Sequence, residues 1–114
     1  VLKEKSDFAA ELAELKNRFT FAESHYEKLA LAYTIQKLSG FDEGYYQYLT
    51  GLLKTPVFSE VSLDLLEDLP YPQGKDRLEI VVINYPKSYM KQRIQNLISR
   101  LKGQAYASPV KRPY

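Results

Sequence analysis

Residues 78–103 read LEIVVINYPKSYMKQRIQNLISRLKG, and this stretch decides the fold that we expect. It opens with four β-branched residues at positions 80–83, and such side chains suit a pleated sheet better than a helix. Tyr85 stands directly before Pro86 and is therefore biased toward an extended backbone. We predict a short β-strand over about residues 78–84. A helix is the alternative, because Asp76 and Glu79 have the spacing of a capping box.

After Pro86 the apolar residues recur at helical spacing. Proline is tolerated in the first turn of a helix, and glycine is a typical residue at a helix C-terminus. We therefore expect a helix between Pro86 and Gly103, followed by a flexible basic tail over residues 104–114. The apolar stripe of this helix consists of Tyr89 or Met90, then Ile94, Leu97, Ile98 and Leu101.

The N-terminal part of the chain is predicted to be helical. Residues 2–39 contain neither glycine nor proline, and their apolar positions alternate at spacings of four and three. They form either one long helix or a hairpin of two helices, about 6–18 and 21–39, with the break at the capping-box pair Thr20 and Glu23. One helix would be roughly 54 Å long, about twice the diameter of a compact domain of this size, so we favour the hairpin.

Two further helices are expected in the middle of the chain. Asp42 can cap a helix over about 43–54, and Thr55 followed by Pro56 is typical of the start of another that ends near Asp68. The predicted fold class is therefore mainly α. It is a bundle-like single domain over residues 1–103, with four to five helices and the one short strand before the C-terminal helix.

Composition narrows the class of protein. Hydrophobic residues make up 45% and charged residues 26% of the 114-residue chain, which is ordinary for a globular domain. No apolar run approaches the roughly 18 residues of a membrane span, so we expect a soluble, intracellular protein without a membrane partner. The chain has no cysteine, which excludes disulfides, thiol catalysis and cysteine-based zinc sites.

Charge is divided unevenly along the chain. Residues 1–73 hold seven Lys or Arg and twelve Asp or Glu, and residues 74–114 hold nine and two, so the halves carry −5 and +7. Such asymmetry points to an acidic partner or to nucleic acid, or else the basic half docks on the acidic half of its own chain or of a second copy. The candidate contact residues are Lys87, Lys91, Arg93, Arg100, Lys102, Lys111 and Arg112.

The geometry of these cations argues against a simple nucleic-acid surface. Arg93 and Arg100 are seven residues apart and share one helical line, whereas the lysines follow another line that diverges by about 160–200°. One flat duplex face could not engage both lines at once.

No group of residues forms a catalytic or metal-binding pattern. His25 is the only histidine and has no second ligand three or four residues away, so we expect a surface or seam histidine. Within the cluster of tyrosines at positions 45, 46 and 48, we expect Tyr45 and Tyr48 at the edge of the core with their hydroxyls toward water. A protein interface and a ligand-stacking surface are the alternatives. We therefore expect no enzyme activity and no cofactor.

The function that we predict is that of a small interaction or assembly subunit, or an adaptor, that binds other protein chains through helical surfaces. Two features indicate that a second chain is bound. The heptad-like seam near the N-terminus is typical of helices that pack on another helix, and a lone strand leaves its backbone groups unpaired. The partner is then another protein or a second copy of the chain. The alternative is a nucleic-acid-binding accessory protein that uses the basic C-terminal helix and tail.

Overall fold

Helices account for all the regular secondary structure of the residues that the structure describes. The structure is a computed structural model, which describes the backbone of residues 5–106 and the side chains of residues 9–103. The mainly α class is confirmed. The described range holds six α-helices and no strand, so the predicted four to five helices are too few and the predicted strand is wrong. The helices are α1 (Lys5–Phe21), α2 (His25–Ser39), α3 (Glu43–Gly51), α4 (Ser59–Glu67), α5 (Lys75–Ile83) and α6 (Tyr89–Tyr106), with short 3-10 segments at Leu52–Lys54 and Pro72–Gly74.

The stretch predicted as a strand over residues 78–84 is helix α5. Leu78 is fully buried, and Val81 and Val82 pack partly against the core, which is the i, i+3, i+4 pattern of one helix face. The preference of β-branched residues for strands is worth at most about 1 kcal/mol and yields to such packing. Asp76 is not the N-cap of a capping box but lies in the first turn of the helix, where its charge interacts favourably with the helix dipole.

The N-terminal segment is a hairpin, and its break lies later than the sequence suggests. Helix α1 continues through Thr20, whose hydroxyl bonds back to the Lys16 carbonyl oxygen at 3.2 Å. Ser24 is the N-cap of α2, and its hydroxyl accepts from the amides of Tyr26 and Glu27. A serine followed three residues later by a glutamate is a second capping-box pattern, one turn beyond the expected one.

Three other predicted boundaries have different outcomes. Asp42 caps α3 as expected, accepting from the amides of Gly44 and Tyr45. Thr55 and Pro56 form a turn, and α4 begins only at Ser59. Gly103 does not end the last helix, since α6 continues to Tyr106. The predicted flexibility of residues 107–114 lies outside the described residues.

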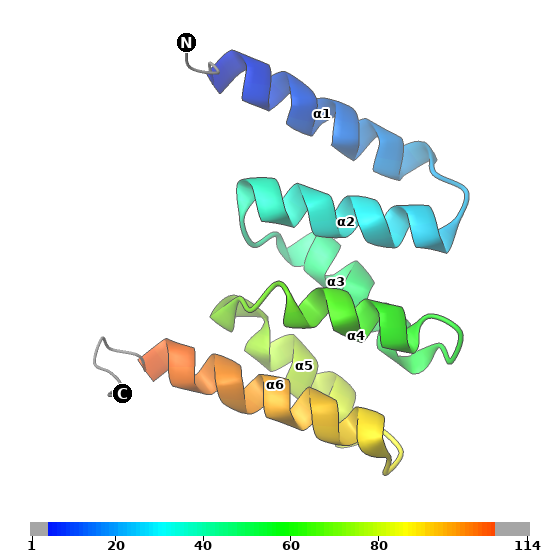
Figure 1. Cartoon of the computed structure of the whole chain (residues 1–114), viewed down its shortest axis with the longest axis vertical. Helices are drawn as coiled ribbons and strands as arrows, with labels where there is room; N and C mark the ends of the chain where they lie inside the picture. Colours follow the sequence, from blue (N-terminus) through cyan, green and yellow to red (C-terminus); the bar gives the residue numbers. More distant parts are fainter. Residues whose placement is uncertain (1–4, 107–114) are drawn as a thin grey trace.

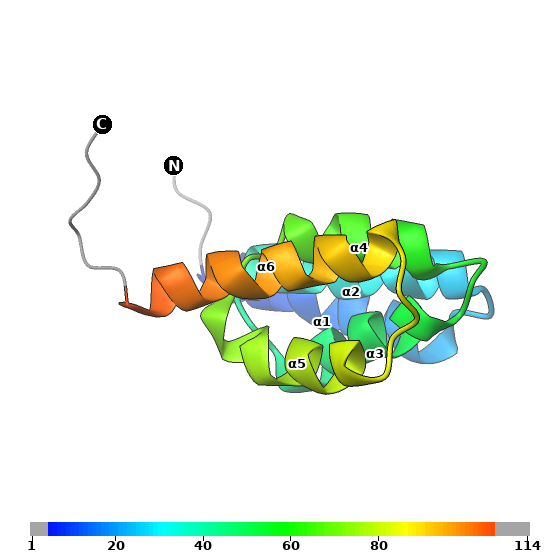
Figure 2. The same cartoon turned by 90° about the horizontal axis from the view of Figure 1, so that it is seen from below.

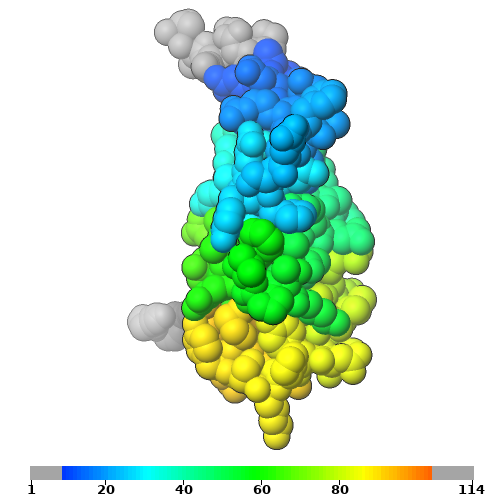
Figure 3. Space-filling view, turned by 90° about the vertical axis from the view of Figure 1, so that its right-hand side faces the viewer, coloured from blue at the N-terminus to red at the C-terminus, as the bar shows by residue number. Residues whose placement is uncertain are grey.

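The helices are stacked in two layers in the order of the chain. Helices α2, α4 and α6 form one layer and α3 and α5 the other, while α1 packs on α2 at one end of the stack (Figures 1 and 2). The space-filling view shows the same order of segments along the long axis (Figure 3). Helices α2, α4 and α6 begin at residues 25, 59 and 89, so a unit of two helices recurs at similar but unequal intervals along the chain. This is the layering of helical-repeat stacks.

The core lies between the two layers. Leu29, Ile35 and Leu97 are at most 2% exposed, and Leu97 belongs to the apolar stripe predicted for the C-terminal helix. The stack is a slab of 44 × 39 × 20 Å, with a radius of gyration of 15.7 Å against about 13 Å for a spherical domain of this length. A slab has two broad faces, and the side chains on those faces differ.

Tyr46 is the largest side chain of the core and the one with an unsatisfied polar atom. The residue is 1% exposed, and its hydroxyl has no hydrogen-bond partner among the described residues. Burial raises the pKa of this phenol well above its ordinary value. Half-buried Tyr71, by contrast, has a partner, because its hydroxyl donates to the Gln36 carbonyl oxygen at 2.8 Å.

We expect Tyr46→Phe and Tyr71→Phe to have different effects on stability. Removing a buried hydroxyl without a partner should leave the free energy of unfolding unchanged or raise it, whereas removing the hydroxyl of Tyr71 should cost about 1 kcal/mol. Urea denaturation of the two variants measures both values. A clear loss for Tyr46→Phe would mean that its hydroxyl is hydrogen-bonded in solution.

Candidate protein-binding face

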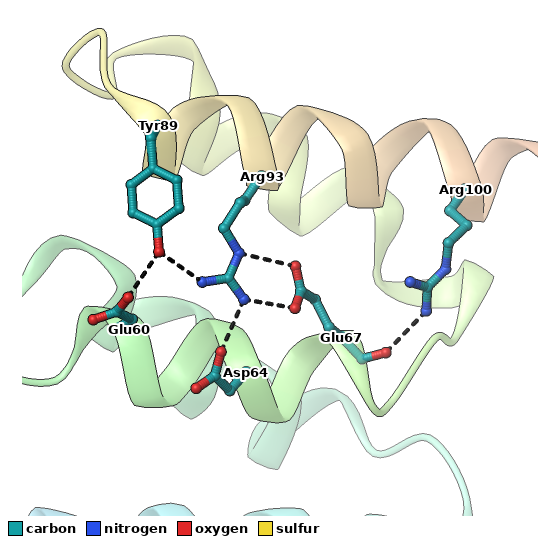
Figure 4. A network of polar contacts seen from close by, with 6 residues as sticks. All are labelled: Glu60, Asp64, Glu67, Tyr89, Arg93 and Arg100. Atoms are coloured by element: carbon teal, nitrogen blue, oxygen red, sulfur yellow. Dashed lines mark hydrogen bonds and ion pairs between the residues drawn. The ribbon is translucent and has the colours of Figure 1, made fainter.

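One of the predicted cations, Arg93, is the centre of a network between α6 and α4 (Figure 4). Its guanidinium donates twice to the Glu67 carboxylate, at 2.6 and 3.2 Å, and once to Asp64 at 2.8 Å. The Tyr89 hydroxyl accepts from Arg93 and donates to Glu60 at 2.7 Å. The hydrogen bonds to Glu67, and then that to Asp64, raise the pKa of Arg93 above its ordinary value.

Arg100 also serves this helix pair, and the lysines lie elsewhere. Arg100 donates to the Glu67 carbonyl oxygen at 2.9 Å, so both arginines of the predicted helical line face α4. The Lys102 ammonium nitrogen lies 3.6 Å from a carboxylate oxygen of Glu79 on α5. Lys87 and Lys91 lie together beside a shallow polar hollow, and Lys111 and Arg112 fall outside the described residues. The excess positive charge of the C-terminal half thus meets, in part, the acidic helix of the same chain.

We expect Arg93→Gln to destabilise the fold by about 1–2 kcal/mol, because its side chain is 21% exposed and its loss leaves two carboxylates without their partner. Lys87→Gln is the control and should change stability by less than about 0.5 kcal/mol. Thermal or urea unfolding distinguishes them. Equal effects would show that the network does not stabilise the contact between α4 and α6.

The outer surface of α4 and α6 is therefore charged, and we call it the charged face: Glu60, Asp64, Glu67, Arg93 and Arg100. The opposite side of the slab is formed by the outer surfaces of α3 and α5 (Figure 2), and besides the charged residues of α5 it carries exposed apolar side chains. Together with a groove between α1 and α3, we call it the apolar face. It comprises Phe19, Gly44, Tyr45, Gln47, Tyr48, Gly51, Leu52, Ile80 and Ile83.

Aromatic rings line the groove between α1 and α3. The Phe19 ring of α1 meets Tyr45 and Tyr48 of α3 edge-on, with centroids 4.9 and 5.3 Å apart. All three side chains are half-buried, and burial raises the pKa of both tyrosines. Lys28 holds its ammonium 5.4 Å from the centre of the Phe19 ring. Half-exposed aromatic side chains of this kind are enriched in protein interfaces.

The aromatic cluster continues from the groove around the start of α2. His25 Nδ1 lies 2.6 Å from the Tyr48 hydroxyl oxygen, and the His25 ring stands 5.2 Å from that of Phe58. Phe58 in turn meets Tyr26 at 4.9 Å. His25 is exposed, and its hydrogen bond reaches the Tyr48 hydroxyl at the end of the groove.

Two glycines leave the floor of the groove open. The groove encloses about 580 Å³, and a Cβ atom added at Gly51 would meet nothing within 4 Å. Gly44 and Gly51 are seven residues apart, so with Tyr48 they form the line of α3 that points away from the core. A backbone without side chains allows another chain to approach closely.

A ridge on α5 completes the apolar face. Ile80 is 65% and Ile83 68% exposed, and both point away from buried Leu78 on the same helix. The two isoleucines are three residues apart and form a contiguous exposed apolar patch on α5. Helix α5 packs beside α3, and Arg77 of α5 pairs with Glu43 of α3 at 2.6 Å.

The sequence indicated only part of this face. Tyr45 and Tyr48, predicted chiefly at the core edge, lie half-buried in the groove, whereas Tyr46 between them is fully buried. The spacing of Gly44, Tyr48 and Gly51 was the signal for an open helix surface. Ile80 and Ile83 went unrecognised because the run that contains them predicted a strand.

We also searched the structure for a metal site and for a membrane-spanning helix, and compared the chain with known proteins. The described residues include no cluster of three or more side chains able to hold a metal ion. None of the helices described is long and apolar enough to cross a membrane. The chain matches no protein-family model, no curated protein and no solved structure.

Proposed function

We propose that this chain is a non-enzymatic protein-binding module that engages its partner through the apolar face. The observation that carries the proposal is the contrast between the two sides of the slab. The charged face pairs its own charges, whereas the apolar face presents an aromatic groove and two isoleucines that are more than half exposed. Contiguous exposed apolar surface of this kind typically marks a site of interaction.

The contacts of the arginines favour protein over nucleic acid as the partner. Binding to phosphates requires several cations on one surface, and their number sets the salt dependence. Arg93 and Arg100 bind α4, and Lys102 lies beside Glu79, so three of the five described candidates already have acceptors within the chain. Lys87 and Lys91 alone would give weak, sequence-independent binding.

A random-peptide display library tests the proposal without knowledge of the partner. The wild-type chain should enrich peptides with large apolar side chains, and Gly51→Glu, which places a charged side chain on the groove floor, should lose them. Val61→Lys changes an exposed residue of α4 and serves as the control that retains binding. Peptides that bind all three proteins equally would contradict the proposal, and so would sub-micromolar, sequence-selective binding of a labelled DNA or RNA oligonucleotide at physiological salt.

A further inference from the structure

The ridge and the groove lie on the same face and on opposite sides of α3. A helix turns by about 100° per residue, so Ile80 and Ile83 lie on the side of α5 that faces away from the core. On α3 the corresponding outer line consists of Gly44, Tyr48 and Gly51. Tyr45 and Leu52 flank that line toward α1, while Glu43 flanks it toward α5. A projecting apolar element and a receiving one therefore stand side by side, separated by one glycine-bearing helix.

We propose that the partner bound by the apolar face is a second copy of this chain, with the Ile80–Ile83 ridge of each copy seated in the α1–α3 groove of the other. This inference rests on the proposed function and names its partner. In a two-fold interface, the same patch on both copies is self-complementary. A two-fold axis over the outer line of α3 exchanges ridge and groove, so both contacts form at once.

Shape and chemistry fit this arrangement. The groove lining contains aromatic rings, a leucine and two glycines, and no ionisable acid or base other than the two phenols. Aliphatic side chains packed on aromatic rings bury apolar surface of both copies. The open position at Gly51 leaves room for the ridge, and the α3 helices of the two copies can approach each other at Gly44 and Gly51, on either side of Tyr48.

Charge and area do not oppose the contact. The ionic groups next to the ridge are paired within the chain: Arg77 with Glu43 at 2.6 Å, and Lys75 with Asp76 at 3.0 Å. Two copies therefore do not bring unpaired like charges together. A stable interface needs about 800 Å² from each partner, so the contact must extend beyond the ridge and the groove over more of this broad side, which measures 44 × 39 Å.

Sedimentation of single variants and of their mixture tests the inference. The wild-type chain should sediment at twice its 13.2 kDa mass at high concentration, with a monomer–dimer equilibrium on dilution. Ile83→Lys alters the ridge and Gly51→Glu the groove, and each should weaken the dimer at least tenfold. Both positions are open to solvent, so the melting temperature of the monomer should change little. Val61→Lys, on α4, should dimerise like the wild type.

The mixture is the decisive sample. When Ile83→Lys is combined with Gly51→Glu, one ridge–groove contact is native on both sides and the other joins the new lysine to the new glutamate. Heterodimers should form although neither variant dimerises alone. A wild-type chain that stays monomeric near 1 mM, a dimer indifferent to both variants, or a mixture that stays monomeric would overturn the inference.

These outcomes are separable from failure of the proposed function. A monomeric chain that still enriches peptides, and loses them on Gly51→Glu, has an apolar face that binds a different protein. A chain that neither dimerises nor enriches peptides overturns both proposals.

Discussion

Gly74→Ala should destabilise the fold by about 3 kcal/mol or more, although it adds a single methyl group. A Cβ at Gly74 would lie 2.2 Å from the Cε2 and Cζ atoms of the Tyr46 ring, which is far too close for carbon atoms that are not bonded to each other. Tyr46 is 1% exposed and belongs to the core cluster, so a shift of its ring disturbs the side chains packed around it. For a domain with a total stability of about 5–15 kcal/mol, such a loss lowers the urea midpoint substantially.

The control and the rescue for this prediction are in the same chain. Gly51→Ala adds the same methyl group where nothing lies within 4 Å, in a helical backbone, and should be neutral or stabilising by up to about 1 kcal/mol. Tyr46→Leu removes the ring that Gly74→Ala strikes, so the double variant should be less destabilised than the sum of the single changes. If the destabilisation of the double variant equals the sum of the two single changes, the effect of Gly74→Ala does not arise from its contact with the Tyr46 ring.

Leu97→Ala should cost about 2–5 kcal/mol of unfolding free energy. Leu97 is 2% exposed in the apolar stripe of α6, in the same cluster as Leu66 of α4 and Leu78 of α5. Truncation leaves a cavity where two layers meet, and the neighbouring helices can close it only in part.

Ile83→Ala is the matched truncation of an aliphatic side chain that is 68% exposed, and it should change monomer stability by less than about 0.5 kcal/mol. The comparison is made under conditions where both variants are monomeric. A loss below about 1 kcal/mol at Leu97 would mean that α6 does not pack on α4 and α5 as described.

The helices themselves were largely predictable from local signals. The cap at Asp42, the hairpin break after α1 and the stripe that carries Leu97 each depend on residues within a turn or two of one another. The errors came where two local signals competed. The β-branched run of α5 predicted a strand because four residues cannot reveal that Leu78 and Val82 meet a core built from distant helices.

The apolar face was less predictable for a different reason. A groove arises from the angle between helices that are separated in sequence, and no spacing within α1 or α3 encodes that angle. The pairing of Arg93 with α4 had a clearer signal, since the opposite charges of the two halves already allowed an intramolecular contact. Which acidic residues would meet which basic ones depended on the order of stacking.

The position of α1 at the end of the stack has a consequence for hydrogen exchange. None of the side chains described in α1 is fully buried, and the helix packs on α2. Its amides should therefore exchange through a local opening that costs less free energy than global unfolding, while those of α2 and α4 exchange only with the whole domain. Because Phe19 supplies one wall of the groove, any occupant of the groove must bind the closed form of α1 and slow its exchange. Exchange rates along α1 thus report occupancy of a site that lies mostly on another helix.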